Sequence, residues 1–283
     1  MAERAVDARR LNWRLTAAGL AYHAQGFSRV RSTQELALAA AAVGVDEGAV
    51  FLADVQAEGR GRAGRRWLAP PATAVMFSAV LRPPRALVRE GSLGLAVGLA
   101  VAEGIERAGG PATELKWPND CLIQGRKVAG VLVEVPDGLT APAAVVGIGC
   151  NVAWRALAPS QRPPGAGTAL DLEGPALDFG DVAFQLISSL DRRYRQWREG
   201  GFASMAEDWG RRLVWVGRSV EVDVGGLLVK GQLVGVDPEG RLRLRTGTGE
   251  TLIPAGDLGL GEGGSVRTPS RHSPPGSACQ ELQ

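Results

Sequence analysis

Lysine is rare in this chain, and two of its three lysines lie in one short segment. Lys and Arg together number 32, and only three of these residues are lysine. Lys116 and Lys127 enclose the stretch WPNDCLIQGR, whereas Lys230 has no such context. A compact ammonium and a planar guanidinium bind anions differently, so a lysine kept among arginines indicates a position that needs a point charge. Chance placement is the alternative.

A glycine loop with several arginines lies upstream of this segment. Gly59 to Trp67 read GRGRAGRRW. Glycines allow backbone amides to approach an anion, and Arg60, Arg62 and Arg65 supply forked donors that suit phosphate or carboxylate. Together with the lysines, the loop predicts a site for a charged, phosphate-bearing intermediate. A purely structural arginine loop is the competing interpretation.

Two other interpretations of the loop fail on context. Gly59, Gly61 and Gly64 match G-x-G-x-x-G, but that dinucleotide motif should open a helix, and here Leu-Ala-Pro-Pro follows Trp67. No acidic residue follows at the distance that a ribose contact needs. Arginine–glycine tracts that bind nucleic acid are long and of low complexity, and this is a single nine-residue loop.

Two strand-like segments carry further candidates. Lys127 precedes the apolar run Ala129 to Val135, and Gly130 lies inside it. A glycine within a strand often allows another group to approach the backbone closely. Asn151 follows the run that ends in Gly-Ile-Gly-Cys. The simpler alternatives are a solvated lysine at a sheet edge and an ordinary exit from strand to loop.

The elements that must position these residues follow from periodicity and turn signals. Residues 154–180 are rich in proline and glycine and predict a loop. Residues 213–260 predict a small antiparallel β-barrel with glycine turns. The expected helices span 32–43, 92–108, 181–198 and 202–211, and the expected strands span 50–57, 75–81, 114–116, 129–135, 143–148, 219–224, 227–236, 242–245 and 250–253. Arg192, Arg193, Arg195 and Arg198 are expected to face water.

Composition excludes several classes of protein. With 283 residues, 45% hydrophobic and 22% charged, the chain resembles an ordinary soluble globular protein. Its net charge of +2 is too small to indicate a nucleic-acid or membrane partner. Three cysteines favour a reducing compartment over a disulfide framework. Two histidines in terminal segments cannot build a zinc cluster or a histidine-based triad. We expect a cytoplasmic protein without signal peptide or membrane span.

Taken in order, these motifs resemble those of the biotin–protein ligase family, over about residues 29–258. The matching elements are Ser32-Thr33, Gln56, the loop GRGRAGRRW, KWPND with Lys127 and Gly130, GIGCNV and the terminal barrel. No single element is specific, but the combination is. The resemblance implies an α+β fold, in which helices flank a mixed β-sheet as in class II synthetases. It also implies an enzyme that adenylates biotin with ATP and transfers biotin to one lysine of a carboxylase carrier domain.

The resemblance implies roles for individual residues. The expected catalytic residues are Lys127, Arg60, Arg62 and Asp120, the last to help deprotonate the carrier lysine. The residues expected to bind biotin are Ser32, Thr33, Gln34, Gln56, Arg60, Gly61, Arg62, Lys127 and Gly130. Those expected to bind ATP are Arg60, Arg62, Arg65, Trp67, Lys116, Asn119, Lys127 and Asn151. Mg²⁺ is expected with ATP, held by phosphates and water, with no metal site made by the protein.

The chain departs from the family pattern at two positions and lacks room for one domain. Arg31 and Gln34 stand where the family usually has an acid and an asparagine. Residues 1–28 form a lead-in segment too short for a DNA-binding domain, so we expect the monofunctional type of ligase with no DNA partner. The remaining domains are expected at 29–212 (catalytic), 213–260 (barrel) and 261–283 (tail without order).

Three questions stay open at this point. A lipoate or octanoate ligase or transferase on a related fold is the nearest rival, and the arginine loop and terminal barrel favour biotin over it. A biotin-sensing module without catalysis is a rival of another class. The resemblance is compatible with a monomer or a homodimer.

Overall fold

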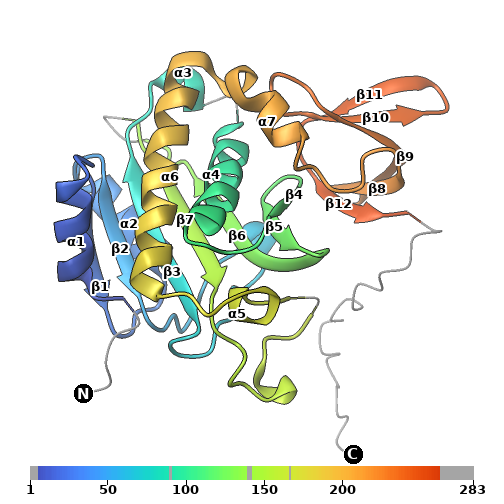
Figure 1. Ribbon diagram of the computed structural model, residues 1–283. Coiled ribbons are helices and arrows are strands. Elements are labelled where there is room, and N and C mark those ends of the chain that lie inside the picture. The colour runs from blue at the N-terminus through green and yellow to red at the C-terminus, as the bar shows by residue number, and fades with distance from the viewer. Residues whose placement is uncertain (1–5, 89–90, 139–141, 166, 262–283) are drawn as a thin grey trace, which may run out of the picture.

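The computed structural model describes residues 6–88, 91–138, 142–165 and 167–261 (Figure 1). The tail predicted to lack order lies, from residue 262 onward, outside this range. None of the described helices has the length and hydropathy of a membrane span.

A seven-stranded mixed sheet forms the centre of the larger part of the molecule. Its strand order is β1-β2-β3-β7-β6-β5-β4. β1 runs parallel to β2, and all other neighbours are antiparallel. The predicted mixed sheet is therefore confirmed. The strands are β1 (His23–Phe27), β2 (Ala49–Ala53), β3 (Ala74–Leu81), β4 (Glu114–Lys116), β5 (Asp120–Ile123), β6 (Arg126–Glu134) and β7 (Ala144–Asn151).

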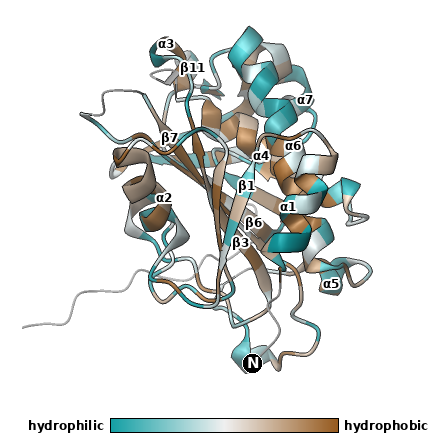
Figure 2. Ribbon diagram, turned by 90° about the vertical axis from the view of Figure 1, so that its left-hand side faces the viewer, coloured by the Kyte–Doolittle hydropathy of each residue, from teal (hydrophilic) through white to brown (hydrophobic). Residues whose placement is uncertain are grey.

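Helices cover both faces of this sheet. α2 lies on one face, and α1, α4 and α6 lie on the other (Figure 2). Strand β3 is buried at every residue because it is covered on both sides. The α-helices are α1 (Ala8–Ala17), α2 (Thr33–Ala42), α3 (Arg85–Val88), α4 (Leu93–Arg107), α5 (Leu170–Glu173), α6 (Phe179–Gly200) and α7 (Ala206–Gly210), and the 3₁₀ turns are η1 (Arg62–Gly64), η2 (Pro159–Gln161) and η3 (Phe202–Met205).

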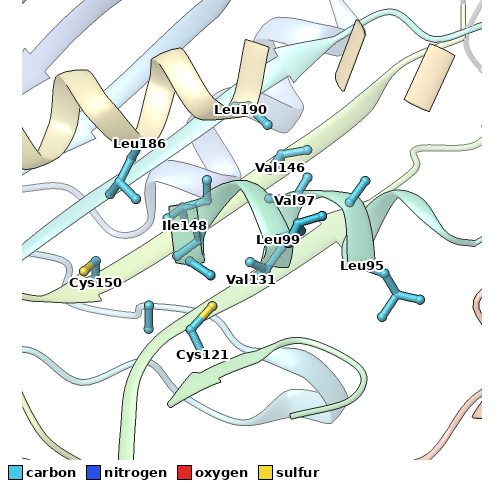
Figure 3. Packing of buried hydrophobic residues seen from close by; sticks show 14 of the residues in the cluster. Leu95, Val97, Leu99, Cys121, Val131, Val146, Ile148, Cys150, Leu186 and Leu190 are labelled. Atoms are coloured by element: carbon cyan, nitrogen blue, oxygen red, sulfur yellow. The ribbon is translucent and has the colours of Figure 1, made fainter. Parts of the chain in front are cut away.

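The main core lies between the sheet, α4 and α6. Figure 3 shows Val97 and Leu99 of α4 close to side chains of the sheet, while Leu95 lies apart from them. α4 approaches α6 closely because Gly104 has no side chain, and a Cβ there would lie 2.9 Å from the Cα of Leu186. Because α4 packs against the sheet on one side and against α6 on another, most of its residues are buried and apolar.

The C-terminal strands form an open sheet, which corrects the expected closed barrel. Their order is β11-β10-β9-β8-β12, with antiparallel neighbours throughout. No pairing joins β11 to β12 within the described chain, so these two strands are edges. The sheet adds one strand, β12, to those predicted. Its strands are β8 (Ser219–Val224), β9 (Leu227–Val236), β10 (Leu242–Thr246), β11 (Gly249–Ile253) and β12 (Asp257–Leu260).

The N-terminal 28 residues are more than a lead-in segment. They contain α1 and β1, and β1 pairs with β2 along the edge of the main sheet. Within α1, Leu11 and Leu15 are buried in the main core. The sequence HAQGF has no strong strand pattern of its own. These residues form a strand because they pair with β2. The segment 154–180, predicted as a loop, contains the short elements η2 and α5.

One side-chain prediction was wrong. Arg193, expected to face water, is buried, with its side chain 7% exposed. It pairs with Glu103 of α4 and with Asp208 of α7, so its charge is compensated inside the helix layer.

Candidate active site

A polar network forms the floor of a first hollow, which lies between α2, the arginine loop, β6 and β7. Gln56 accepts hydrogen bonds at Oε1 from the backbone N–H of Thr33 (2.8 Å) and from Thr33 Oγ1 (3.2 Å). Thr33 Oγ1 lies 2.9 Å from Ser78 Oγ, which donates to Gln34 Oε1 at 2.9 Å. The buried Ser32 hydroxyl lines the same hollow and has no partner in the protein. The floor therefore offers fixed polar groups to a small ligand.

Glycines on β6 and β7 open the wall of this hollow. Gly130 faces Gly149 across the two strands. A Cβ at Gly149 would lie 2.5 Å from the Trp67 ring, and one at Gly130 would lie 3.1 Å from the Lys127 ammonium. The sequence predicted that some group approaches the backbone at Gly130 but did not identify it. The structure shows that the groups at these glycines are the Trp67 indole and the Lys127 side chain.

The arginine loop folds back on itself over the hollow. Arg60 bridges to Arg66, and Gly61 N–H donates to the Arg65 carbonyl at 2.7 Å. The loop also contacts other elements on both sides. Arg60 lies 4.0 Å from Glu35 of α2, while Arg62 and Arg65 lie 3.5 Å and 2.8 Å from Asp257 of β12.

Among Arg60, Arg62 and Arg65, Arg62 has the least exposed side chain, at 28%. It donates to Asn119 Oδ1 at 3.3 Å and to the Gly256 carbonyl at 3.4 Å. Burial lowers the pKa of Arg62, and the Asp257 carboxylate acts in the opposite direction. The guanidinium lines the first hollow and carries part of its positive charge.

Lys127 and Asp120 lie at the boundary between the first hollow and a second one. The Lys127 ammonium lies 2.5 Å from Asp120 Oδ1 and 5.7 Å from the centroid of the Trp67 ring. The residues that line both hollows are Arg65, Arg66, Trp67, Asn119, Asp120 and Lys127. An anion in either hollow can therefore approach the same ammonium.

The second hollow is larger, about 490 Å³ against about 150 Å³ for the first. Lys116, Lys127, Arg65 and Arg66 make its lining strongly basic. Burial lowers the pKa of Lys116; Asp120 opposes this effect and Lys127 adds to it. A bound anion would favour the charged form of Lys116.

Asn151 is held in one orientation beside the second hollow. Its Nδ2 donates to the Thr168 carbonyl at 2.9 Å, and Thr168 N–H in turn donates to the Lys127 carbonyl at 2.8 Å. Asn151 Oδ1 is buried without a partner. Segment 167–168 thus connects the asparagine to the strand that carries the lysine.

The structure brings the predicted residues together around these two hollows. All nine residues expected to bind biotin line the first hollow. Of the residues expected to bind ATP, Arg65, Trp67, Lys116, Asn119, Lys127 and Asn151 line the second, while Arg60 and Arg62 line only the first. Sequence reasoning missed Ser78, Asp257 and Trp215. The sequence gives a weak indication of a role for Ser78, because it is the one residue with a hydroxyl in the otherwise apolar strand β3.

Metal ligands are sparse near the hollows. Across the part of the chain that the structure describes, no group of three or more His, Cys, Asp or Glu side chains could hold a metal ion. Asp120 and Asp257 are the carboxylates that line the second hollow.

Comparison with known proteins points to one family. The Biotin/lipoate A/B protein ligase family matches residues 26–151. A Mycobacterium tuberculosis biotin–[acetyl-CoA-carboxylase] ligase is 39% identical over 233 residues, 80% of this chain and 85% of its own length. The Bacillus subtilis bifunctional ligase/repressor BirA is 32% identical over 81% of this chain and 71% of its own length. The solved Aquifex aeolicus biotin protein ligase in complex with biotin and ATP has a TM-score of 0.71, at 29% identity, covering 84% of this chain and 97% of that one.

Proposed function

Because the chain belongs to the biotin/lipoate A/B protein ligase family and matches its biotin ligases over most of its length, we propose that it is an ATP-dependent biotin–protein ligase. It adenylates biotin and then transfers biotin to a lysine of a carboxylase carrier domain. The observation that carries this proposal is the position of Lys127, whose ammonium lies between two hollows under the arginine loop.

The first step joins two anions. An oxygen of the biotin carboxylate attacks the α-phosphorus of ATP, the bond to the bridging oxygen breaks, and pyrophosphate leaves. We place biotin in the first hollow, where Thr33, Gln56 and the unpartnered Ser32 hydroxyl would orient its polar ring. We place the nucleotide in the second hollow, near Lys116 and Asn151. The carboxylate and the α-phosphate would then both approach the Lys127 ammonium, which offsets their repulsion.

The arginine loop stabilises and shields the product of that step. Arg60 and Arg62 would neutralise charge that develops on the phosphate and on pyrophosphate. The loop already covers the first hollow, and its contacts to Glu35 and Asp257 hold it there. Covering the mixed anhydride keeps water from hydrolysing it.

The second step releases AMP. The neutral amine of the carrier lysine attacks the acyl carbon, an amide bond forms and the bond to AMP breaks. We assign to Asp120 the role of accepting the proton that the amine loses, because its carboxylate lies beside Lys127 at the boundary of both hollows.

Mg²⁺ would enter with ATP. The two carboxylates of the second hollow and the absence of a three-residue cluster in the described segments fit an ion held mainly by phosphates and water. When bound, the ion shields the negative charge of the phosphates. We infer that the reaction takes place in the cytoplasm, where ATP is available.

The test uses the purified chain with ATP, biotin and a biotin carboxyl carrier domain. We expect intact-mass spectrometry to show one biotinyl group on the carrier, and none on a carrier whose acceptor lysine is arginine. Lipoate in place of biotin should give no product, which separates this ligase from a lipoate ligase. Biotin and ATP alone should release pyrophosphate. Tight biotin binding without pyrophosphate would instead indicate a biotin-sensing module.

A further inference from the structure

A buried carboxylate lies next to the strand that carries Lys127, although it lines neither hollow. The side chain of Glu173, the last residue of α5, is 2% exposed. A carboxylate in such a position is stable only if its charge is compensated. The Arg126 guanidinium lies 2.5 Å from Glu173 Oε1, and the Thr168 hydroxyl donates to the same oxygen. Arg126 directly precedes Lys127 on β6, so the carboxylate connects α5 to the start of this strand.

Thr168 extends this connection to the active site. The residue is fully buried, and its backbone N–H donates to the Lys127 carbonyl at 2.8 Å. Its own carbonyl accepts from Asn151 at 2.9 Å. Thr168 therefore contacts Glu173 through its side chain, and it contacts the two candidate site residues through its backbone.

Lys127 lies beyond the end of one neighbouring strand. β6 begins at Arg126, but β7 pairs with it only from Ala129 onward. At Lys127, segment 167–168 provides the hydrogen bond instead of β7. A lysine side chain is long and flexible, so the position of its backbone decides where the ammonium can reach. The group that restrains Thr168 thus also affects the ammonium at the boundary of the hollows.

We propose that Glu173 is a positioning residue, which acts through Thr168 to hold the Lys127 ammonium at the boundary of the two hollows. This rests on the proposed function, because adenylation is the step that Lys127 would serve. Glu173 itself would touch neither biotin nor ATP. Its loss should therefore slow the first step more than it weakens the binding of biotin.

The experiment measures pyrophosphate release at varied biotin and at varied ATP. Glu173→Ala should lower kcat by roughly 10- to 100-fold, the scale of loss when a reacting group is displaced by about 1 Å. The KM for biotin should change much less, because Thr33 and Gln56 are untouched. Glu173→Gln keeps an acceptor for the Thr168 hydroxyl, so it should retain more of the kcat than Glu173→Ala.

Further variants separate positioning from folding. Thr168→Val removes the hydroxyl and should also lower kcat, whereas Thr168→Ser keeps the hydroxyl and should restore most of it. Glu47→Gln is the matched control. Glu47 also has one hydroxyl partner and one arginine partner, Tyr194 at 2.7 Å and Arg198 at 3.3 Å, but it lines neither hollow. Its substitution should lower the thermal midpoint and leave kcat unchanged.

A double variant tests whether Glu173 acts through Lys127. Once Lys127→Met has removed the ammonium, there is no charge left to position. Adding Glu173→Ala should then slow pyrophosphate release by at most about twofold more, because residues that act as one unit have non-additive effects.

Two results would overturn the proposal. One is an unchanged kcat in folded Glu173→Ala or, if that variant does not fold, in Thr168→Val. The other is a double variant in which the two losses multiply, which would show that Glu173 serves the fold and not the lysine. A wild-type chain that releases no pyrophosphate would contradict the ligase function itself, a different outcome from either of these.

Discussion

Lys127 lies where the proposed reaction would need a single compact cation. Its ammonium contacts Asp120 and lies near the Trp67 ring, at the boundary of two hollows. In a closed pocket, the repulsion between a carboxylate and a phosphate amounts to several kcal/mol, roughly, and one shared cation removes it. A guanidinium spreads its charge over a plane and would not reach the same point.

Replacing Lys127 should therefore block the first step. We expect Lys127→Met to slow pyrophosphate release by roughly 100- to 1,000-fold, the effect of losing one electrostatic donor. Lys127→Arg should lose at least roughly tenfold despite its charge. Lys230→Met is the matched control, since that lysine pairs with Glu221 on the C-terminal sheet. Full activity in Lys127→Arg would show that position of charge is unimportant here.

Arg60 should retain the adenylate as well as help to form it. Its side chain is 45% exposed and contacts only Glu35 in the ion pairs of the described chain, at 4.0 Å. We expect Arg60→Ala to release the adenylate roughly tenfold faster, as for loss of one charge-assisted hydrogen bond. The released anhydride should biotinylate lysines of an unrelated protein added to the assay, detected by blotting. If Arg60→Ala shows no more stray labelling than Arg243→Ala, the loop does not retain the intermediate.

At the scale of elements, the arginine loop depends on a strand that is distant in sequence. Asp257 of β12 accepts from Arg65 at 2.8 Å and lies 3.5 Å from Arg62, almost two hundred residues away. The C-terminal sheet thus helps to hold the loop over the site. These pairs are partly exposed, so each contributes at most about 1 kcal/mol.

Loss of Asp257 should loosen the loop without unfolding the chain. We expect Asp257→Asn to speed trypsin cleavage after Arg62 and Arg65 by roughly fivefold, with the fragments identified by mass spectrometry. The control is Glu250→Gln, which removes an exposed ion pair with Arg243 on the same sheet. Equal cleavage in both variants would mean that β12 does not restrain the loop.

At the scale of the whole molecule, a buried charge cluster connects the helices that cover the sheet. Arg193 of α6 donates through Nε to Glu103 of α4 at 3.0 Å and through Nη2 to Asp208 of α7 at 2.9 Å. Burial alone would raise the pKa of Glu103, but the hydrogen bond and charge of Arg193, with Arg192, outweigh it and lower that pKa. The site depends on this layer because α4 supports the sheet from behind.

Glu103→Gln should destabilise the fold in a pH-dependent way. At neutral pH we expect the free energy of unfolding to fall by about 2 kcal/mol, because the buried guanidinium of Arg193 loses one of its two carboxylate partners and keeps Asp208. A lowered carboxyl pKa contributes stability above its ordinary value of 4.5 that is lost as pH falls through the lowered pKa. The difference from wild type should therefore shrink below about pH 4.5. Denaturant titrations at several pH values measure this, with the 89% exposed Glu207→Gln as control; a constant difference would contradict it.

Much of the fold and of the site's chemistry could be predicted from the sequence, because that information is local. The apolar runs of β3 and α4 predicted their own elements, and Gly59 to Trp67 carried both the glycines and the arginines of the loop. Lys127 and Gly130 belong to one strand. Their roles as binding residues stay predictions, although the structure places them around one hollow.

What only the tertiary structure decided depends on contacts between distant segments. Strand order made β1 part of the sheet, and the pairing of β6 with β7 set Gly130 opposite Gly149, under Trp67. The same packing brought Asp257 to the arginine loop and Trp215 to the second hollow. Sequence patterns report how one segment partitions between water and core. They carry no information on which remote side chain will compensate a given charge, because that is set by the packing of the complete chain.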